Sequence, residues 1–346
     1  MAKCDLAIEF ERSDRRYRPG ETVSGKVTVQ VNAKVQCNGL TVKRLWHTHG
    51  KGNYAEGSDS VEEVVFSGEW WPGETHAYPF AFEVPAAPVS YHGEVLNVDH
   101  YVAARADIPW AIDPKAEEDF LLLAGPESCQ IPTEVSEAMQ GASTQLQGMG
   151  AACGVIFGMI FFCAGLIPLG IGVVGVSQGE MAAVMAIPFG GIFMLVGGGI
   201  AFMASRKILA ERKLGPVEVT VSPRQLNPGD RFEVELRFAP KARIELNEIT
   251  ATLKGQEVVI SGSGTKRTTH RHVFHDEVQQ LLAACDVWPE EGTSAKGSFQ
   301  IPHDAAPSFV ASDNRLEWSV ELHVDIARWP DWQSTEILAV APVPAP

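Results

Sequence analysis

The middle of the chain holds two long apolar runs that carry almost no charge. No charged residue lies between Gln147 and Glu180, and none follows Glu180 until Arg206. As helices rising about 1.5 Å per residue, the most apolar windows, 151–176 and 181–204, reach roughly 39 and 36 Å, which exceeds a hydrocarbon core of about 30 Å. Because neither window has a polar face, we expect membrane-spanning helices and not the buried helix pair of a soluble protein.

A short polar break, residues 177–180 (Ser-Gln-Gly-Glu), joins the two windows. A connection of this length predicts antiparallel neighbours that return the chain to its starting side. The basic residues follow the second window at once, whereas the break carries only an acid. The positive-inside rule therefore predicts an integral membrane protein with two spans and both termini in the cytoplasm. The residues that set this orientation are Arg206, Lys207, Arg212 and Lys213.

Both apolar windows contain glycines, which make the predicted helices narrower at those positions. Gly154 and Gly158 form a G-x-x-x-G pattern, which is typical of helices that approach closely in a membrane. The pattern predicts helix packing at these two residues, and the glycine-rich helices are also candidates for homo-oligomer contacts. Neither window contains an Asp, Glu, His, Lys or Arg side chain, which argues against an ion path or a proton relay through a single hairpin.

Length and composition limit the number of domains, the class of partner and the cellular compartment. The 346 residues favour two domains at roughly 150 residues each. Acidic residues outnumber basic ones 43 to 28, and this excess argues against a nucleic-acid partner. The cysteines lie far apart without a C-x-x-C motif, which favours a reducing compartment.

The segments on either side of the apolar windows alternate between apolar and polar residues with a period of two. Segments 4–10 and 23–31 show this before the windows, and segments 232–238 and 316–326 show it after them. Such alternation is typical of half-buried strands, and the Pro-Gly turns between them suit antiparallel sandwiches. Val27 and Val29 are predicted to face one core, and Val234 and Leu236 the other.

The two flanks also repeat each other. Residues 19–21 (Pro-Gly-Glu) match 228–230 (Pro-Gly-Asp), and residues 82–85 (Phe-Glu-Val-Pro) match 299–302 (Phe-Gln-Ile-Pro). In each copy a Pro and a Ser follow, and a long alternating segment comes next. This order predicts a duplicated β-sandwich.

The first copy resembles the N-terminal arrestin domain. The resemblance rests on residues 17–27 (YRPGETVSGKV), 40–43 (LTVK), 79–85 (PFAFEVP) and 101–104 (YVAA), and it covers most of residues 1–125. The second copy, about 216–341, resembles the C-terminal arrestin domain mostly through the repeat. The family includes arrestins, α-arrestins, the retromer's arrestin-like subunit and bacterial sporulation-control proteins. The resemblance implies paired seven-stranded sandwiches and a role as a binding adaptor rather than an enzyme.

The chain departs from the family in two respects. Arrestins are soluble with a short hinge, whereas a hairpin separates the sandwiches here, so the usual packing of the two domains cannot be assumed. A P-P-x-Y motif is absent, so recruitment of a ubiquitin ligase does not carry over.

These observations predict a mostly β protein with two antiparallel immunoglobulin-like, arrestin-type sandwiches separated by an α-helical transmembrane hairpin. The expected division is a first sandwich at 1–125, a linker at 126–148, the hairpin at 149–205, a basic juxtamembrane segment at 206–215 and a second sandwich at 216–346.

Candidate chemistry is sparse. Motifs for nucleophilic, metal-dependent or nucleotide chemistry are absent, so we expect no catalytic residues and no cofactor. The weak metal candidates are His270 and His272, which share one face of a predicted strand. Zinc needs three or four converging ligands, so solvent-facing histidines on an exposed hairpin are the favoured interpretation of the pair.

Two functions are consistent with this organisation. The first is a membrane-anchored scaffold or adaptor that binds unknown partner proteins at the cytoplasmic face, with the bilayer as its other partner. The alternative is an oligomeric membrane effector, in which the hairpins assemble into a pore or deform the membrane under the control of the sandwiches. Fold resemblance alone does not decide between them.

Overall fold

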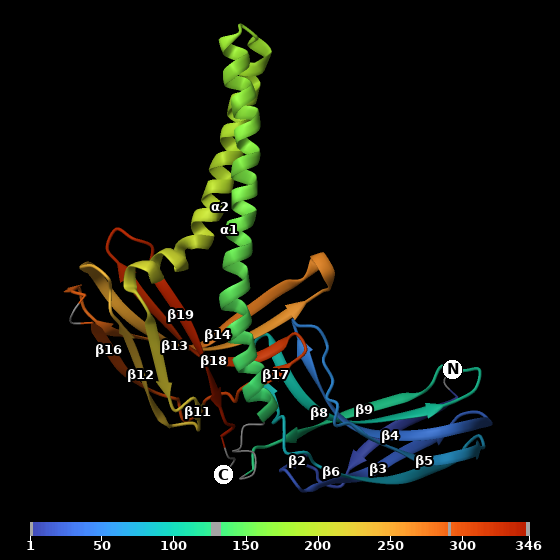
Figure 1. The fold of residues 1–346 in the computed structure, drawn as a ribbon. Coiled ribbons are helices and arrows are strands. Elements are labelled where there is room, and N and C mark those ends of the chain that lie inside the picture. Colours follow the sequence, from blue (N-terminus) through green and yellow to red (C-terminus); the bar gives the residue numbers. More distant parts are fainter. Residues whose placement is uncertain (1–2, 126–132, 290–291, 344–346) are drawn as a thin grey trace.

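A computed structural model describes residues 3–125, 133–289 and 292–343 (Figure 1). Two β-sandwiches lie at the open end of a long helical hairpin, whose tip projects away from both. The predicted fold class is confirmed, because the chain is mostly β and the helices separate two β domains.

The first sandwich packs a three-stranded sheet against a larger one. The small sheet has the order β1 (Cys4–Phe10), β3 (Thr22–Val31), β6 (Thr75–Glu83). The large sheet has the order β2 (Arg16–Tyr17), β9 (Lys115–Leu122), β8 (Leu96–Asp107), β4 (Val35–Gly50), β5 (Val61–Trp70), and β7 (Tyr91–His92) pairs with β8. In this arrangement β5 and β6 are outer strands of their sheets.

The second sandwich repeats this order and adds one short strand. Its small sheet is β10 (Val217–Ser222), β12 (Arg231–Phe238), β16 (Thr293–Gln300). Its large sheet is β11 (Gln225–Leu226), β19 (Trp332–Val340), β18 (Asn314–Ile326), β13 (Ile244–Ser261), β14 (Thr268–Leu282), with β15 (Cys285–Val287) on β13 and β17 (Phe309–Ala311) on β18. A short helix, η3 (Gly264–Lys266), connects β13 to β14. The sequence repeat is therefore a structural repeat, down to one parallel pair in each large sheet, β2 with β9 and β11 with β19.

Period-two alternation places the cores where the sequence predicts them. Val27 and Val29 on β3 are completely buried in the first core, and Val234 and Leu236 on β12 in the second. Thr28, between the two valines, is only half-buried. Each strand therefore directs alternate side chains to the core and to solvent.

The hairpin consists of α1 (Thr133–Ser177), η2 (Met181–Met185) and α2 (Ala186–Leu214). Its apolar segments are 153–177 and 181–206, with mean hydropathy values of 2.3 and 2.0, and both are long and apolar enough to cross a membrane. The predicted linker 126–148 overlaps the start of α1, and its residues 126–132 lie outside the described part of the chain.

Small residues let the two helices approach closely. A Cβ on Gly158 would lie 2.5 Å from the backbone nitrogen of Ala201, and one on Gly154 would lie 2.8 Å from the Cβ of Ala204. Further along, Gly165 and Gly190 face each other's backbone in the same way. These glycines pack the hairpin against itself, and none of them can gain a side chain without moving a helix.

The end of α2 belongs to the second sandwich. Ala210 and Leu214 are completely buried in its core, and the indole Nε1 of Trp329 donates to the Leu209 carbonyl at 3.1 Å. Arg206 lies 3.6 Å from Asp331 on the same loop. Residues 206–214 are thus a helical extension packed on the sandwich, and only Gly215 of the predicted juxtamembrane segment lies beyond the helix.

Candidate functional site at the junction of the two sandwiches

The two sandwiches meet through a small apolar cluster. The first sandwich contributes Val95 together with Leu96 and Val98 at the start of β8. The second contributes Val259, Phe309 and Leu316 from β13, β17 and β18. Trp46 on β4 packs edge-on against Phe309, with ring centroids 5.8 Å apart. Because this cluster joins apolar side chains of both sandwiches, the contact fixes how the two domains face each other.

A buried carboxylate lies beside this cluster. Glu257 on β13 is 1% exposed, and its Oε2 accepts hydrogen bonds from the backbone N–H groups of Val95 at 2.7 Å and Leu96 at 2.8 Å. Its Oε1 accepts from the Glu94 N–H and from the Tyr91 hydroxyl, both at 3.1 Å. One acid of the second sandwich therefore satisfies four donors of the first. Charge-assisted bonds of this kind are the stronger class of hydrogen bond.

The turn between β7 and β8 is shaped to receive that carboxylate. Successive backbone N–H groups point to one centre, which is the geometry of an anion-binding nest. A Cβ on Gly93 would lie 2.4 Å from Oε1 of Glu257, so only glycine permits this approach. Burial, followed by the charge of Glu257, raises the pKa of Tyr91. The tyrosine therefore stays a protonated donor to the acid.

A second polar contact docks the loop after β4. The Asn53 backbone N–H donates to the Ile260 carbonyl at 2.8 Å, and its side-chain amide donates to the Gly262 carbonyl at 3.0 Å. The same amide donates to Asp313 at 2.8 Å, and Asn314 donates back to the Asn53 carbonyl at 2.8 Å. The Asn53 loop is held through backbone groups as well as side chains. The two sandwiches are therefore joined by two separate polar contacts, one at Glu257 and one at Asn53.

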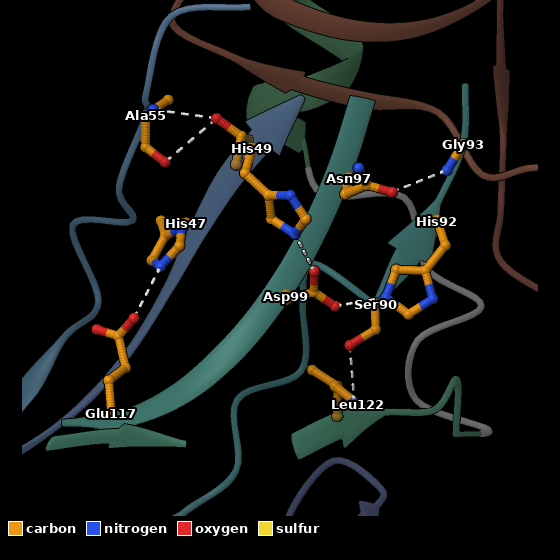
Figure 2. Close-up of polar contacts among 11 residues, drawn as sticks. His47, His49, Ala55, Ser90, His92, Gly93, Asn97, Asp99, Glu117 and Leu122 are labelled. Carbon is orange, nitrogen blue, oxygen red and sulfur yellow. Dashed lines mark hydrogen bonds and ion pairs between the residues drawn. The ribbon is translucent and has the colours of Figure 1, made fainter. Parts of the chain in front are cut away.

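Two histidines share one aspartate next to the junction (Figure 2). His49 on β4 and His92 on β7 each donate through Nε2 to Asp99 on β8, at 2.6 Å in both cases. The Asp99 side chain is 8% exposed, whereas the imidazoles are 47% and 60% exposed. The carboxylate ties β7 to β4 and β8, and it thereby braces the turn that carries the nest for Glu257.

The neighbouring His47 does not join this cluster. Its ring stacks on Tyr101 with centroids 4.1 Å apart, and its Nε2 lies 3.6 Å from Glu117 (Figure 2). Within the described residues, no group of three or more His, Cys, Asp or Glu side chains is placed to hold a metal ion.

The two sequence candidates for metal ligation lie on β14. His272 is opposite Glu257 in the register of β13 and β14, and His270 is opposite Val259. The Nε2 of His270 is 3.0 Å from the Ser261 hydroxyl. Both side chains are partly exposed.

A fully buried histidine lies inside the first sandwich. His100 on β8 is 0% exposed and donates from Nε2 to the Pro88 carbonyl at 2.7 Å. Desolvation by burial lowers its pKa from 6.5 to about 4. The ring is therefore neutral in the folded protein throughout the mildly acidic range.

This shift predicts acid sensitivity of the first sandwich. The unfolded chain binds a proton below pH 6.5 and the folded chain does not until about pH 4, so stability is full above pH 6.5 and falls between these values. The expected loss between pH 7 and pH 5 is about 2 kcal/mol. Urea unfolding at both pH values measures it. His100→Gln keeps a donor for the Pro88 carbonyl. This variant should be less stable than the parent at pH 7 but should not show the additional loss of stability between pH 7 and pH 5. An equal loss between these pH values in the variant would contradict the attribution of the acid sensitivity to His100.

The junction residues are absent from the sequence candidates. Glu257 stands in the alternation Ala251, Leu253, Gly255, Glu257, Val259, so an acid at an inward position of an apolar pattern was the available signal. Asp99 gives no such signal, because it stands between the inward positions Val98 and His100, where a polar residue is expected.

No protein-family model matches the chain, and no curated protein sequence matches it. One solved structure with a similar region is Spo0M, the sporulation control protein from Bacillus subtilis. That similarity covers 36% of this chain and 48% of Spo0M, with 14% sequence identity and a TM-score of 0.30. This chain thus spans about half the length of Spo0M.

Proposed function

We propose that the chain is a membrane-anchored, non-catalytic scaffold that holds two sandwiches at the cytoplasmic face of a membrane and binds partner proteins there. The surface of the hairpin carries this proposal. Only 17% and 11% of the residues in its two apolar windows are buried. Large side chains such as Ile167, Leu195 and Met203 are 66%, 79% and 70% exposed. A bilayer is the environment in which such a surface is stable.

The attachment of α2 supports a positioning role for the hairpin. Because Ala210 and Leu214 are part of the second core, a helix leaving the membrane continues into the sandwich without a flexible joint. The second sandwich then stays close to the bilayer, and the junction at Glu257 places the first sandwich relative to the second. Both sandwiches lie at the same end of the hairpin (Figure 1), as a scaffold on one membrane face requires.

The family resemblance supports the adaptor role, since arrestin-type sandwiches act by binding. The orientation rests on the basic residues that follow the second window. Arg212 is exposed there, whereas Arg206 lies near Asp331 and Lys213 lies over the ring of Trp329. The side chain of Lys207 lies outside the described part of the structure.

Cysteine labelling tests the topology. Ser177→Cys at the hairpin tip should react with an impermeant maleimide added to intact cells. Gln30→Cys and Glu218→Cys, one exposed site on each sandwich, should react only after permeabilisation. Native thiols compete little, because burial raises the pKa of Cys37 to about 11 and Cys4 is fully buried; Cys129, Cys153, Cys163 and Cys285 are replaced by serine.

Two results would reject the proposal. Labelling of either sandwich before permeabilisation would place it outside the cytoplasm. Extraction of the protein from membranes by alkaline carbonate would show that the hairpin is not inserted.

A further inference from the structure

The first sandwich has an open side between its two sheets. The strand β5 is the outer strand of the large sheet and β6 is the outer strand of the small sheet, and both face this side. Between them runs a groove of about 680 Å³. Its walls include Arg44, Val61 and Glu63 from the large sheet and Ala81, Glu83 and Pro85 from the small one.

The inner face of β5 is uncovered in this groove. Val61 is opposite Arg44 and Glu63 is opposite Val42 in the register of β4 and β5, and opposite residues share a face of the sheet. Val42 is completely buried in the core, so this face is the inner one. Val61 is nevertheless 47% exposed, because the small sheet ends at β6 and does not extend over β5.

The same side of the second sandwich is closed. There the counterparts of β5 and β6 are β14 and β16. A Cβ on Gly297 of β16 would lie 2.4 Å from Leu281 of β14 and 2.6 Å from the Gln279 side-chain oxygen. Leu281 and Leu282 pack against the core. The opening is therefore a particular feature of the first sandwich and not of the repeated fold.

A buried cation forms part of the floor of the groove. Arg44 is 4% exposed, and its guanidinium donates to the Asp59 backbone carbonyl at 2.7 Å and lies 3.4 Å from the Asp59 carboxylate. Its Nε is buried and has no hydrogen-bond partner within the described part of the chain. Because Arg44 also lines the groove, a carboxylate bound there adds a charge-assisted partner to the guanidinium.

We infer that this groove binds an extended peptide of a partner protein, which pairs with β6 as a fourth strand of the small sheet and directs a carboxylate to Arg44. An outer strand offers unpaired N–H and C=O groups to such a peptide. An added strand beside β6 covers Val61. The exposed Glu63 and Glu83 on the rim favour basic residues on either side of the acidic one. This inference deepens the proposed scaffold function and rests on it for its biological setting.

The strand β5 offers a matched pair of test substitutions. Val61→Glu introduces a charge into the groove, and Val64→Glu introduces the same charge on the opposite face of the same strand, where the side chain is 60% exposed. Both positions are too exposed for either change to unfold the sandwich.

The test selects random nonapeptides from a displayed library on the full-length protein in nanodiscs. Selected peptides should contain one acidic position among alternating apolar residues. Their synthetic forms should bind the Val61→Glu variant at least about tenfold more weakly, and the Val64→Glu variant within about twofold of the parent. Replacing the peptide's acid by its amide should weaken binding to the parent but not to Arg44→Gln, whose folding is checked by thermal melting.

The inference fails if no peptide is enriched over a parallel selection on Val61→Glu, or if selected peptides bind both valine variants equally. The Val61 comparison decides the outcome even where Arg44→Gln fails to fold. Peptide binding in nanodiscs does not depend on the topology of the protein in cells. A negative binding result therefore contradicts the groove inference, whereas a negative labelling result contradicts the membrane scaffold.

Discussion

Replacing Glu257 by alanine should separate the two sandwiches without unfolding either. The substitution removes the acceptor of three backbone N–H groups and of the Tyr91 hydroxyl. Each buried donor left without its acceptor costs about 1–3 kcal/mol, and water can recover part of that only by opening the junction. Amide hydrogen exchange at residues 94–96 and the distance between spin labels at Gln30→Cys and Glu218→Cys measure the opening.

Glu245→Ala is the matched control, since it removes an exposed acid from the same strand. It should leave both exchange and distance unchanged. Unaltered exchange in the Glu257→Ala variant would mean that the apolar cluster around Leu96 and Phe309 holds the junction alone. Loss of the second core along with the junction would show that the acid stabilises the sandwich itself and not the contact.

The hairpin and the strands were predictable because local pattern determines them. An uncharged run of sufficient length indicates a span whatever surrounds it, and the helices 153–177 and 181–206 differ from the predicted windows by only a few residues. Alternation with a period of two likewise identified Cys4–Phe10 as a strand, with Cys4 and Ile8 buried and Asp5 and Glu9 exposed.

The junction was not predictable because its partners are far apart in the chain and belong to different copies of the repeat. The contact from Glu257 to Val95 spans 162 residues. Nothing near Val95 marks its turn as an anion nest, because backbone N–H groups leave no trace in composition. The resemblance to arrestins left the domain packing open, since the hairpin replaces the usual hinge.

The ends of the hairpin escaped prediction for a different reason. Residues Arg206 to Lys213 are basic enough to indicate a membrane flank, and that charge masks the apolar pair Ala210 and Leu214 at helical spacing. Tertiary packing extends α2 over this segment, because the second core needs those two side chains. The start of α1 at Thr133 likewise lies in a stretch whose Ser, Thr, Gln and Gly content favoured an irregular linker.

Val27→Asp should unfold the first sandwich while the protein stays in the membrane. Val27 is 0% exposed on the central strand of the small sheet, between Ile8 and Tyr78. An unpaired buried carboxylate costs several kcal/mol against a domain stability of about 5–15 kcal/mol. Insertion depends on the spans' own hydrophobicity, so carbonate extraction should still leave the chain in the pellet. Limited proteolysis should digest residues before the hairpin and spare the second sandwich.

Leu236→Asp should have the reverse pattern, with one addition that follows from the packing of α2. Because Leu236 shares its core with Ala210 and Leu214, unfolding that core also frees the end of the helix, and cleavage should begin near residue 206. Thr28→Asp is the matched control: the site is adjacent to Val27 but half-buried, so stability should change by less than about 1 kcal/mol. A loss of stability from Thr28→Asp as large as that from Val27→Asp would mean that the strand register is wrong by one residue. Loss of membrane retention in either core variant would mean that the sandwiches help to insert the hairpin, because intact spans alone would then be insufficient.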